Sequence, residues 1–478
     1  MTTATKDDVV RVDFEFRREL ARKVEGNLAS FCYQCGACVG DCPSATYGAE
    51  FNPREIMLKV LYGLGEELLT KESILWQCTN CYNCHERCPQ EVKPVEVIIS
   101  LKNMLTDRGL SPSPVARVIK TFEETGRTTP IGATIDRQRA QFGLPPLPPV
   151  PMDEIQAIVA EEDTGGAQVE LRRAAPEARR AGTRRFAMFP GCLIPARHPA
   201  MEFAIRESMQ RLGIEIVDLD GMSCCPDPIY FKSKDKVAWL SVAARNLTLA
   251  EDRNIDLFTS CSGCTATLSE TYHLLHDEAL RAKVNGRLKR IGREYAGTSR
   301  VRHIATLLRD VVGYDAVRAS VVRPLNGLKI AIHYGCHLLK PSKIMQVDDP
   351  NDPSMMEALV SALGATPVRH RNWYLCCGKA CQTESIPSNM MHDLLGSVQN
   401  EHADLLCLIC PTCFGQFDYG QAKIAQQFHE DYRTPPVYYF QLLAFAQGVL
   451  YEKLNFDRHR FKPECLRRYE RPVDTDQK

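Results

Sequence analysis

Apolar residues follow a helical period in the first part of the chain. Over residues 13–29, Asp13 precedes apolar residues at every fourth position, namely Phe16, Leu20, Val24 and Leu28, which predicts a capped amphipathic helix. Asn52-Pro53-Arg54-Glu55 supplies a cap residue, a proline in the first turn and a glutamate at the third position, which predicts the start of a second helix. A third helix is predicted over residues 94–108, with Gly109 as its stop. We therefore expect this part to be helical.

Short, continuous apolar runs replace the helical period in the second half, and they occur twice. The runs that end at Gly191-Cys192 and Gly335-Cys336 each predict a buried strand. After each run the chain repeats one order: helix, strand, twin cysteines, helix, strand, cysteine pair. The repeat predicts two similar α/β lobes, residues 184–325 and 326–478, with the cysteines at the carboxyl ends of parallel strands, where open sheets place their ligands. We expect the lobes to face one another across a cleft.

Residues 111–183 lack this regularity. Residues 143–151 form a proline-rich spacer, Glu161-Glu162-Asp163 follows, and an arginine- and alanine-rich stretch continues to Arg185. This composition is typical of a solvated linker, since it offers few core residues. The alternative is a strap that docks onto another domain or onto a partner.

Composition narrows the class of protein. The chain has 478 residues and no formal net charge, so nothing indicates a nucleic-acid partner. Twenty-one cysteines without an apolar segment after Met1 favour a reducing compartment, the cytoplasm, where clustered cysteines bind metal or do redox work. The longest apolar run, residues 437–449, is interrupted by Gln441 and Gln447 and is too short to cross a bilayer. Any membrane association is expected to come through a partner.

Two cysteine motifs in the first part predict iron–sulfur clusters. Each reads C-x2-C-x2-C-x3-C-P, the bacterial ferredoxin signature, in which the fourth cysteine ligates the other cluster. One [4Fe–4S] cubane is therefore assigned to Cys32, Cys35, Cys38 and Cys88, and the second to Cys78, Cys81, Cys84 and Cys42. A pair of zinc sites would not explain the third cysteine or the proline. Because the flanking sequence is helical, we expect an α-helical ferredoxin-type domain over residues 1–110. The whole fold is then α+β and multidomain.

The second half carries two sets of five cysteines, which we call nests. The first nest is Cys192, Cys224, Cys225, Cys261 and Cys264, and the second is Cys336, Cys376, Cys377, Cys410 and Cys413. A cubane takes one protein ligand at each of its four irons, so either one cysteine is spare or the cluster is not an ordinary cubane. An opened cluster could bind a substrate sulfur, which points to cleavage of a sulfur–sulfur bond.

Some assignments around the nests stay open. Cys407 competes with Cys410 by spacing alone, and Cys381, Cys407 and Cys465 are otherwise expected to be small buried hydrophobes. Cleaving a disulfide reductively needs protons, and a histidine can deliver them near neutral pH. His337, just past the strand, is the better candidate, whereas His333 is expected to hydrogen-bond to the backbone inside it. Lys340 could hold an anionic substrate such as a sulfonate or phosphate, but it is expected to be solvated, and Asp227 is expected to be a turn residue.

Residues 186–450 resemble the B subunit of heterodisulfide reductases, a tandem of cysteine-rich "CCG" domains. The resemblance rests on the repeated C…CC…CxxC pattern, the segment from His333 to Pro341, Cys377-Gly378 and the segment from Cys410 to Gln421. Residues 20–110 resemble the C subunit, and the order looks like the fused D-type subunit of this family. The resemblance implies that each nest holds a noncubane [4Fe–4S] cluster, and that a disulfide is clamped between the two clusters and cleaved.

Two functions follow as hypotheses. The first is the catalytic iron–sulfur subunit of a heterodisulfide reductase-like complex, with a small disulfide or thiol as substrate. Since no Gly-rich dinucleotide fingerprint follows a strand, we expect no flavin in this chain, and an electron partner that is a flavoprotein like the A-type subunit of the family or a membrane cytochrome b. The second is an electron relay, like the iron–sulfur subunits of glycolate and glycerol-3-phosphate dehydrogenases.

Overall fold

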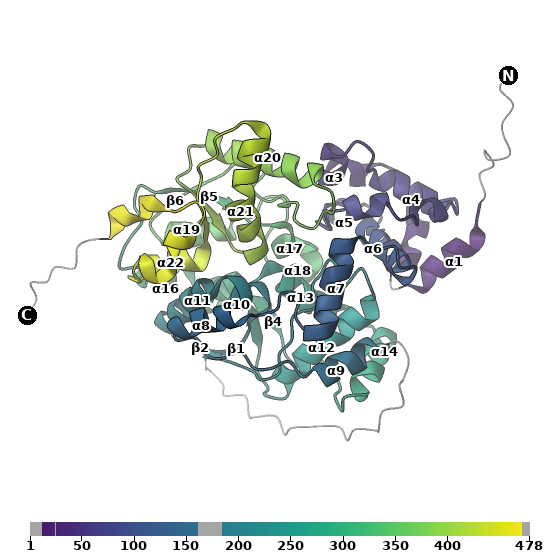
Figure 1. Cartoon of the computed structure of the whole chain (residues 1–478), viewed down its shortest axis with the longest axis horizontal. Coiled ribbons are helices and arrows are strands. Elements are labelled where there is room, and N and C mark those ends of the chain that lie inside the picture. The colour runs from purple at the N-terminus through teal and green to yellow at the C-terminus, as the bar shows by residue number, and fades with distance from the viewer. Residues whose placement is uncertain (1–11, 24, 161–183, 471–478) are drawn as a thin grey trace, which may run out of the picture.

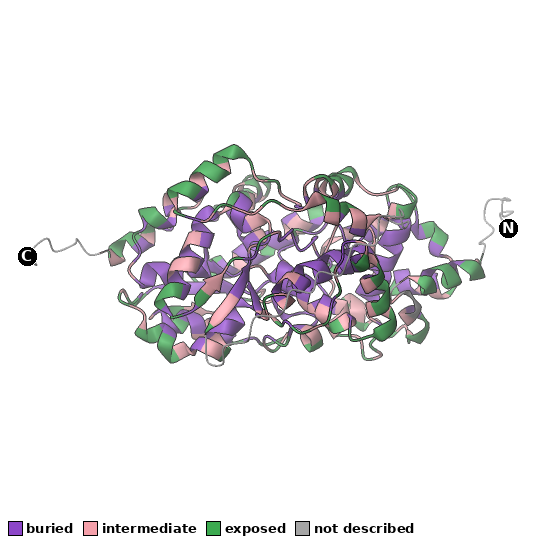
Figure 2. Cartoon of the chain, turned by 90° about the horizontal axis from the view of Figure 1, so that it is seen from below, coloured by how far each residue is buried: buried purple, intermediate pink, exposed green. Residues whose placement is uncertain are grey.

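The computed structural model describes residues 12–23, 25–160 and 184–470 (Figure 1). A helical region, residues 12–110, lies at one end of the long axis. Two α/β lobes, residues 184–325 (first lobe) and 326–470 (second lobe), fill the rest of the molecule. Figure 2 shows that buried residues follow the strands and the inner helices, whereas exposed residues lie on the outer helix faces. The expected α+β multidomain class is confirmed.

The helical region is built from short helices around the cysteine motifs. As predicted, the Asp13 side chain caps the first helix, and the Asn52 side chain accepts hydrogen bonds from the backbone of Arg54 and Glu55. The elements are α1 (Phe14–Arg22), η1 (Gly26–Phe31), α2 (Ala37–Gly40), α3 (Pro43–Tyr47), α4 (Pro53–Leu61), η2 (Gly65–Leu68), η3 (Ile74–Gln77), α5 (Asn83–Glu86) and α6 (Pro94–Asp107).

The first helix is shorter than predicted. It ends at Arg22, and a separate 3-10 turn begins at Gly26; the predicted apolar position Val24 lies outside the described residues. Glu25 adopts a left-handed conformation with φ of 61°, which no continuing α-helix permits. The period of four therefore runs across two elements.

Each lobe contains one four-stranded parallel sheet. In the first lobe the order is β2-β1-β3-β4, with β1 (Arg185–Phe189), β2 (Glu215–Val217), β3 (Leu257–Thr259) and β4 (Val301–His303). In the second lobe the order is β6-β5-β7-β8, with β5 (Lys329–His333), β6 (Thr366–Val368), β7 (Leu405–Leu408) and β8 (Pro436–Tyr438). The predicted repeat is therefore present in the structure, strand by strand.

The helices of the two lobes pack against each other. Helix α11 contacts α22, and α13 contacts α17 and α18. The Tyr438 hydroxyl, at the end of β8, donates a hydrogen bond of 2.6 Å to the Ser260 carbonyl of the first lobe. The first-lobe helices are α10 (Leu193–Arg197), α11 (Pro199–Arg211), α12 (Lys236–Glu251), α13 (Ser262–Leu274), α14 (Glu278–Lys289), α15 (Ile304–Leu307), η4 (Leu308–Val312) and α16 (Tyr314–Ala319). The second-lobe helices are α17 (Cys336–Leu339), α18 (Ser342–Met345), α19 (Met355–Ala362), α20 (Ser385–Asn400), α21 (Pro411–Phe428), α22 (Tyr439–Ala446), η5 (Glu452–Leu454), η6 (Phe456–Arg458) and η7 (Glu464–Tyr469).

The expectation of a solvated linker is wrong for residues 112–160, which we call the strap. The strap forms α7 (Ser113–Thr125), α8 (Ala133–Gln141) and α9 (Met152–Val159), and it docks onto the first lobe. Arg139 of α8 forms a buried ion pair with Glu202 of α11, and Glu154 of α9 pairs with Arg245 of α12. Polar contacts, more than apolar ones, hold α8, which is why composition does not reveal it. Residues 161–183 lie outside the described residues.

Helix α6 is buried on nearly every side. Apolar residues Ile98, Leu101 and Leu105 of this helix are buried, but Glu96 and Lys102, at 2% and 1% exposure, are buried as well. Their partners come from other segments, so the polar face of this helix is an interface. Among the described residues, no helix combines the length and the apolar character needed to cross a membrane.

Candidate functional site

The cysteines of both nests lie at the carboxyl ends of the two sheets. In each sheet the strand order changes direction beside the first strand. The change lies between β1 and β3 in the first lobe and between β5 and β7 in the second. Open parallel sheets bind ligands in the crevice at such a reversal. All ten cysteines line one cavity of about 220 Å³, which we call the ten-cysteine cavity. The structure therefore gathers the predicted nest residues around a common space: Cys192, Cys224, Cys225, Cys261, Cys264, Cys336, Cys376, Cys377, Cys410 and Cys413.

Within each nest the thiols lie close enough to interact directly. The Sγ atoms of Cys336 and Cys376 are 3.7 Å apart. Hydrogen bonds from Cys224 and Cys264 lower the pKa of Cys225 to about 5, and those from Cys376 and Cys413 hold the pKa of Cys377 well below its usual range. The second cysteine of each twin pair thus favours the thiolate, the form that binds metal, whereas hydrogen bonds with neighbouring thiols raise the pKa of Cys264 and Cys376. This donor set fits an iron–sulfur group.

The two nests meet at Cys261 and Cys410. A hydrogen bond from Cys261 is the largest cause that lowers the pKa of Cys410, although the two residues belong to different lobes. Cys410 follows β7 and begins α21, whereas Cys407 lies inside β7, fully buried, and its thiol pKa is raised by burial alone. Cys407 does not line the ten-cysteine cavity, and Cys410 does.

The cysteines of the helical region form two groups, as the motif predicts. Cys32, Cys35, Cys38 and Cys88 line one small pocket, and Cys42, Cys78, Cys81 and Cys84 line another. The first group is near the surface, since Cys35 is exposed, whereas Cys78 and Cys81 of the second group are buried. Backbone amides approach the sulfurs: Asn80 N donates to Cys78 Sγ at 3.4 Å, and Val92 N donates to Cys88 Sγ at the same distance. Such bonds are typical of iron–sulfur sites.

The inner group of the helical region abuts the second nest. Cys81 packs in one small cluster with Cys376 and Cys381, against Cys336. Segment 80–86, which carries Cys81 and Cys84 of the inner group, is tied to α17 and α18. His337 Nε2 donates to the Asn80 carbonyl at 2.9 Å, Lys340 Nζ donates to Asn83 Oδ1 at 2.6 Å, and Ser342 Oγ donates to Glu86 Oε2 at 2.7 Å. The expectation that Lys340 is solvated is therefore wrong: it is 2% exposed and lies over the Tyr374 ring.

The two histidines near Cys336 differ in their surroundings. His337 lines the ten-cysteine cavity, and its bond to a carbonyl places a hydrogen on Nε2. Burial lowers the pKa of His337, so the ring is neutral near pH 7. The sequence predicts that His333 bonds to the backbone, but both of its ring nitrogens lack a hydrogen-bond partner among the described residues, and its ring meets Phe417 edge-on.

The strap contributes side chains to the first nest that no sequence signal indicated. Thr128 Oγ1 donates to Cys192 Sγ at 3.1 Å, and the Cys224 amide donates to the Gly126 carbonyl at 2.9 Å. The Arg127 guanidinium is buried beside the same thiols, and burial lowers its pKa. Asp227 is a turn residue, as expected, because its carboxylate accepts the amides of Ile229 and Tyr230, both at 2.7 Å. It also lines the cavity, and burial raises its pKa to about 6.

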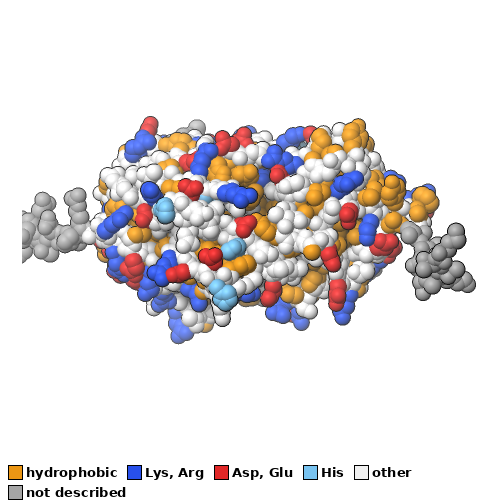
Figure 3. Space-filling model, turned by 90° about the horizontal axis from the view of Figure 1, so that it is seen from above, with side chains coloured by type: hydrophobic (Ala, Val, Ile, Leu, Met, Phe, Trp, Pro, Cys, Tyr) orange, Lys and Arg blue, Asp and Glu red, His pale blue; other side chains and the backbone are white. Residues whose placement is uncertain are grey.

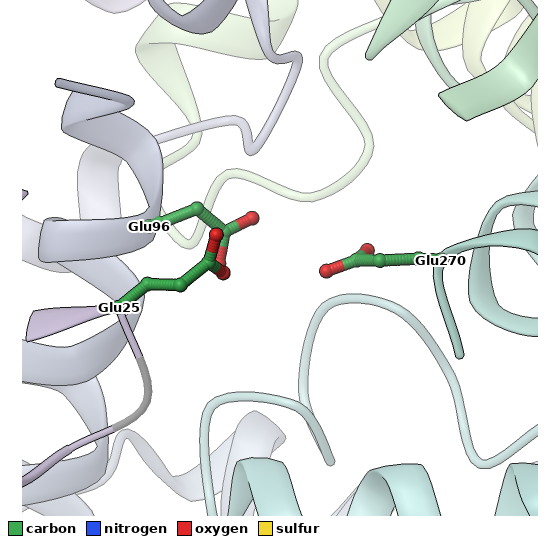
Figure 4. Close-up of side chains that lie close together, drawn as sticks. All are labelled: Glu25, Glu96 and Glu270. Atoms are coloured by element: carbon green, nitrogen blue, oxygen red, sulfur yellow. The ribbon is translucent and has the colours of Figure 1, made fainter. Parts of the chain in front are cut away.

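A buried ion network joins the helical region to the first lobe. Figure 4 shows Glu25 and Glu96 pointing from the helical side toward Glu270 of α13. Lys232 Nζ lies 3.1 Å from Glu96 and 2.5 Å from Glu270, and Lys236 Nζ lies 2.6 Å from Glu96. The ammonium groups therefore occupy the space in which three carboxylates alone could hold a cation. Burial opposes ionisation, but Lys232 and Lys236 hold the pKa of Glu96 well below its usual range.

Family comparisons match both parts of the chain. The family described as "Cysteine-rich domain" matches residues 186–269 and 330–418, and the "4Fe-4S dicluster domain" family matches residues 28–92. Each lobe thus carries one cysteine-rich match, and the helical region carries the dicluster match.

Similar proteins divide in the same way. The B subunit of the ferredoxin/F(420)H(2)-dependent CoB-CoM heterodisulfide reductase of Methanosarcina acetivorans is 37% identical over 58% of this chain and 93% of its own length. The iron–sulfur C subunit of the CoB–CoM heterodisulfide reductase of Methanopyrus kandleri is 33% identical over 32% of this chain and 88% of its own length. The membrane anchor subunit of the 8-methylmenaquinol:fumarate reductase of Wolinella succinogenes is 30% identical over 57% of this chain and 96% of its own length.

One solved structure shares the arrangement of nearly the whole chain. A hypothetical protein from Helicobacter pylori superposes with a TM-score of 0.59 at 13% identity, covering 94% of this chain and 76% of the other. At that identity the likeness concerns the fold alone.

Proposed function

Because the chain belongs to the heterodisulfide reductase family, with a part like the C subunit fused to a part like the B subunit, we propose that it is the catalytic iron–sulfur subunit of such a reductase complex. Family membership makes it an iron–sulfur electron-transfer subunit. The proposal adds that a small disulfide is cleaved, or formed, in the ten-cysteine cavity. The observation that carries it is the convergence of two complete five-cysteine nests on one cavity.

The ligand sets proposed are those that the structure groups in space. Cys32, Cys35, Cys38 and Cys88 would hold one cubane, and Cys42, Cys78, Cys81 and Cys84 the other. Each nest would hold one noncubane [4Fe–4S] cluster, with Cys410 rather than Cys407 in the second. When bound, these clusters supply one-electron redox chemistry and iron that can bind sulfur.

The protein's own residues would shape the reaction space. The cavity is lined by apolar groups such as Ile194 and Ile229, which exclude water from around the thiolates. Arg127 supplies positive charge beside the first nest. The one ring hydrogen of neutral His337 lies on Nε2 against the Asn80 carbonyl, so delivery of a proton to a product sulfur would require Nδ1 to take one up first. Protonation of the product sulfurs needs such a group, since the cavity offers few others.

We propose that the electron partner binds over the outer cysteine group. Cys35 is exposed there, and five of the large apolar side chains exposed among the described residues belong to this region: Val12, Phe14, Phe31, Tyr33 and Tyr62. Figure 3 shows hydrophobic side chains gathered toward the right-hand end of the molecule, the end at which Figure 1 shows the helical region. An apolar surface of this kind is typical of a protein interface. A flavoprotein or a membrane cytochrome b is the proposed partner.

The second candidate is an electron relay without substrate chemistry in this chain. A specific comparison favours it: one similar protein is named as a membrane anchor of a fumarate reductase. In a relay the nests would pass electrons without binding a substrate sulfur.

Electron paramagnetic resonance (EPR) of the cluster-loaded protein separates the two candidates. Iron analysis should first give about sixteen atoms per chain, as four [4Fe–4S] clusters require. We expect added thiol to produce a new signal from the oxidised protein under anaerobic conditions, because the thiol sulfur occupies the cavity between the nests. A full iron content with no thiol-dependent signal would support the relay and reject the proposal.

A further inference from the structure

A second cavity, of about 360 Å³, lies between the two lobes and shares no lining residue with the ten-cysteine cavity. Its walls are the middle of α13, strand β4 with the residues after it, and the segment from Lys343 to Val347 at the end of the second lobe's α18. None of the ten nest cysteines lines it. It is therefore separate from the proposed reaction space and is not assigned by anything in the proposed function.

The lining of this second cavity is rich in positive charge. Arg300, Arg302, Arg309 and Lys343 line it, and the one carboxylate among the lining residues is Asp310. Asp310 pairs with both Arg302, at 3.4 Å, and Arg309, at 2.6 Å, so it offsets one charge of the two. Lys343 pairs with Glu91 outside the cavity, through side chains that are 73% and 68% exposed, and such a pair is weak in water. The lining keeps a surplus of positive charge.

Neutral donors complete the lining. Ser269 and Tyr272 contribute hydroxyl groups to it, whereas the hydroxyls of the lining residues Thr265 and Thr306 already donate to the Cys261 and His303 carbonyls at 3.1 and 2.7 Å. His303, which is 1% exposed, also lines it. His303 Nδ1 accepts the Ala305 amide at 3.2 Å, so the ring hydrogen is on Nε2, and Nε2 has no hydrogen-bond partner among the described residues. Burial lowers the pKa of His303 to about 4, which keeps the ring neutral and this tautomer in place at pH 7. A buried donor without an acceptor is costly.

We propose that the second cavity binds a small oxyanion, a phosphate or sulfonate group, between the lobes. Guanidinium groups match the planar pairs of oxygens of such anions, and hydroxyls and the His303 N–H supply further donors. A metal cation is disfavoured, because the lining offers one carboxylate against four cationic side chains. An apolar ligand is disfavoured, because charged and hydroxyl groups dominate the lining. The anion would bridge β4 of one lobe and the end of α18 of the other.

The test uses the whole cluster-loaded protein under anaerobic conditions and low salt. Inorganic phosphate is titrated by calorimetry and by ³¹P line broadening, and sulfate is used as a competitor. We expect saturable binding of one phosphate, and at least a tenfold loss of affinity in Arg302→Gln and in Arg300→Gln. Arg318→Gln is the matched control, since Arg318 on α16 is 61% exposed and ion-paired outside the cavity. Its affinity should equal that of the unmodified protein.

Further arms identify the source of the anion. Glycerol 3-phosphate and ethanesulfonate carry the same groups on an organic molecule. Tighter binding of either than of inorganic phosphate assigns the cavity to an organic anion, and equal or weaker binding assigns it to a free ion; both support the proposal. No saturable binding by any probe, or equal affinities in all three arginine variants, would overturn it. Arg302→Lys keeps a positive charge next to Asp310 but lacks the planar guanidinium group. It therefore shows whether a loss of phosphate affinity in Arg302→Gln comes from the lost guanidinium geometry or from misfolding. Weakened phosphate binding by a folded Arg302→Lys protein supports the proposal. Unchanged binding by folded Arg302→Gln and folded Arg302→Lys proteins rejects it.

Discussion

At the residue scale, three positions along β7 separate a cysteine in the core from a cysteine in the cavity. Cys407 lies within the strand, opposite Ile332 and Val437 of the neighbouring strands. Cys410 follows the strand end and faces Cys261 and Cys413. In open parallel sheets, the side chains that bind ligands lie just beyond the carboxyl ends of the strands. In the run Cys407-x2-Cys410-x2-Cys413 the cysteines are evenly spaced, yet Cys407 lies in the core and Cys410 lines the cavity.

We predict that Cys410→Ala removes the iron of the second nest, whereas Cys407→Ala does not. The first change removes a thiolate donor, and the second shortens a side chain in the apolar core. Iron content should fall by up to about four atoms per chain in Cys410→Ala, the content of one cluster. An iron loss in Cys407→Ala with Cys410→Ala unaffected would reverse the assignment of the ligands.

Buried histidines give the free energy of unfolding a defined pH dependence. His370 Nε2 donates to the Ile332 carbonyl at 3.0 Å, and Nδ1 bonds to Ser397 Oγ at 2.9 Å. Burial lowers the pKa of His370 to about 4. The unfolded chain has a histidine pKa of about 6.5 and takes up a proton first as pH falls. Stability from His370 is therefore fully present above about pH 6.5 and is lost as pH falls toward about 4.

We predict that His370→Gln reduces the loss of stability between pH 7 and pH 5. The histidine accounts for about 1 to 2 kcal/mol of that loss, at roughly 1.4 kcal/mol per pH unit below 6.5. Denaturant unfolding followed by circular dichroism at the two pH values gives the difference. His276→Gln, at an exposed position, is the control for exchanging a histidine for glutamine. Equal pH dependence in both variants would contradict the prediction.

At the element scale, the strap is the element that brings an outside side chain into a nest. Helices α7 and α9 carry it along the first lobe, and the turn after α7 places Thr128 against Cys192. A hydrogen bond to a ligand sulfur stabilises the more negative, reduced state of an iron–sulfur cluster. The strap therefore belongs to the machinery of the first nest.

We predict that Thr128→Val lowers the midpoint potential of the cluster in the first nest by about 40 mV, which corresponds to ~1 kcal/mol for one electron. A redox titration followed by EPR measures it. Thr129→Val is the matched control, because Thr129 lines the same cavity without a hydrogen bond to a cysteine in the described part of the chain. Identical potentials in the two variants would show that the Thr128 contact does not act on the cluster.

Pattern and motif predicted much at this scale, and the failures have physical reasons. The repeated order of elements along the two lobes was predicted from the apolar runs and the cysteine pattern, and the grouping of motif cysteines agrees with the expected ligand sets. Helix α8 was not predicted, because its buried residue is the charged Arg139 and the partner of Arg139, Glu202, lies in another element. The polar face of α6 was not recognised as an interface for the same reason, since the lysines that neutralise Glu96 are more than a hundred residues away. Long-range ion pairs leave no local period.

At the scale of the whole molecule, the buried ion network fixes the helical region on the first lobe. Lys232 is fully buried and contacts Glu96 of the helical region, Glu270 of the first lobe and the Tyr82 hydroxyl, which neighbours Cys81. Removing one member of such a network leaves a buried charge without its partner. Segment 80–86 carries both the Tyr82 contact to Lys232 and the contacts to α17 and α18. The network therefore also sets how closely the inner cysteine group approaches the second nest.

We predict that Lys232→Met destabilises the protein by about 3 kcal/mol and separates the unfolding of the helical region from that of the lobes. Calorimetry should then show two transitions where the unmodified chain shows one. Lys343→Met is the control: it removes an exposed pair between the helical region and the second lobe and should cost less than about 1 kcal/mol. A single, unshifted transition in Lys232→Met would mean that the network does not hold the helical region in place.

The docking of the strap has a consequence for how such a protein can be divided between genes. The Methanopyrus kandleri relative, an iron–sulfur C subunit, matches 32% of this chain. If the chain were cut between residues 160 and 184, one polypeptide would carry Thr128 and the other would carry Cys192. In a heteromeric version the first nest would then receive the Thr128 hydrogen bond from the other polypeptide, so the potential of that centre would depend on assembly of the two gene products.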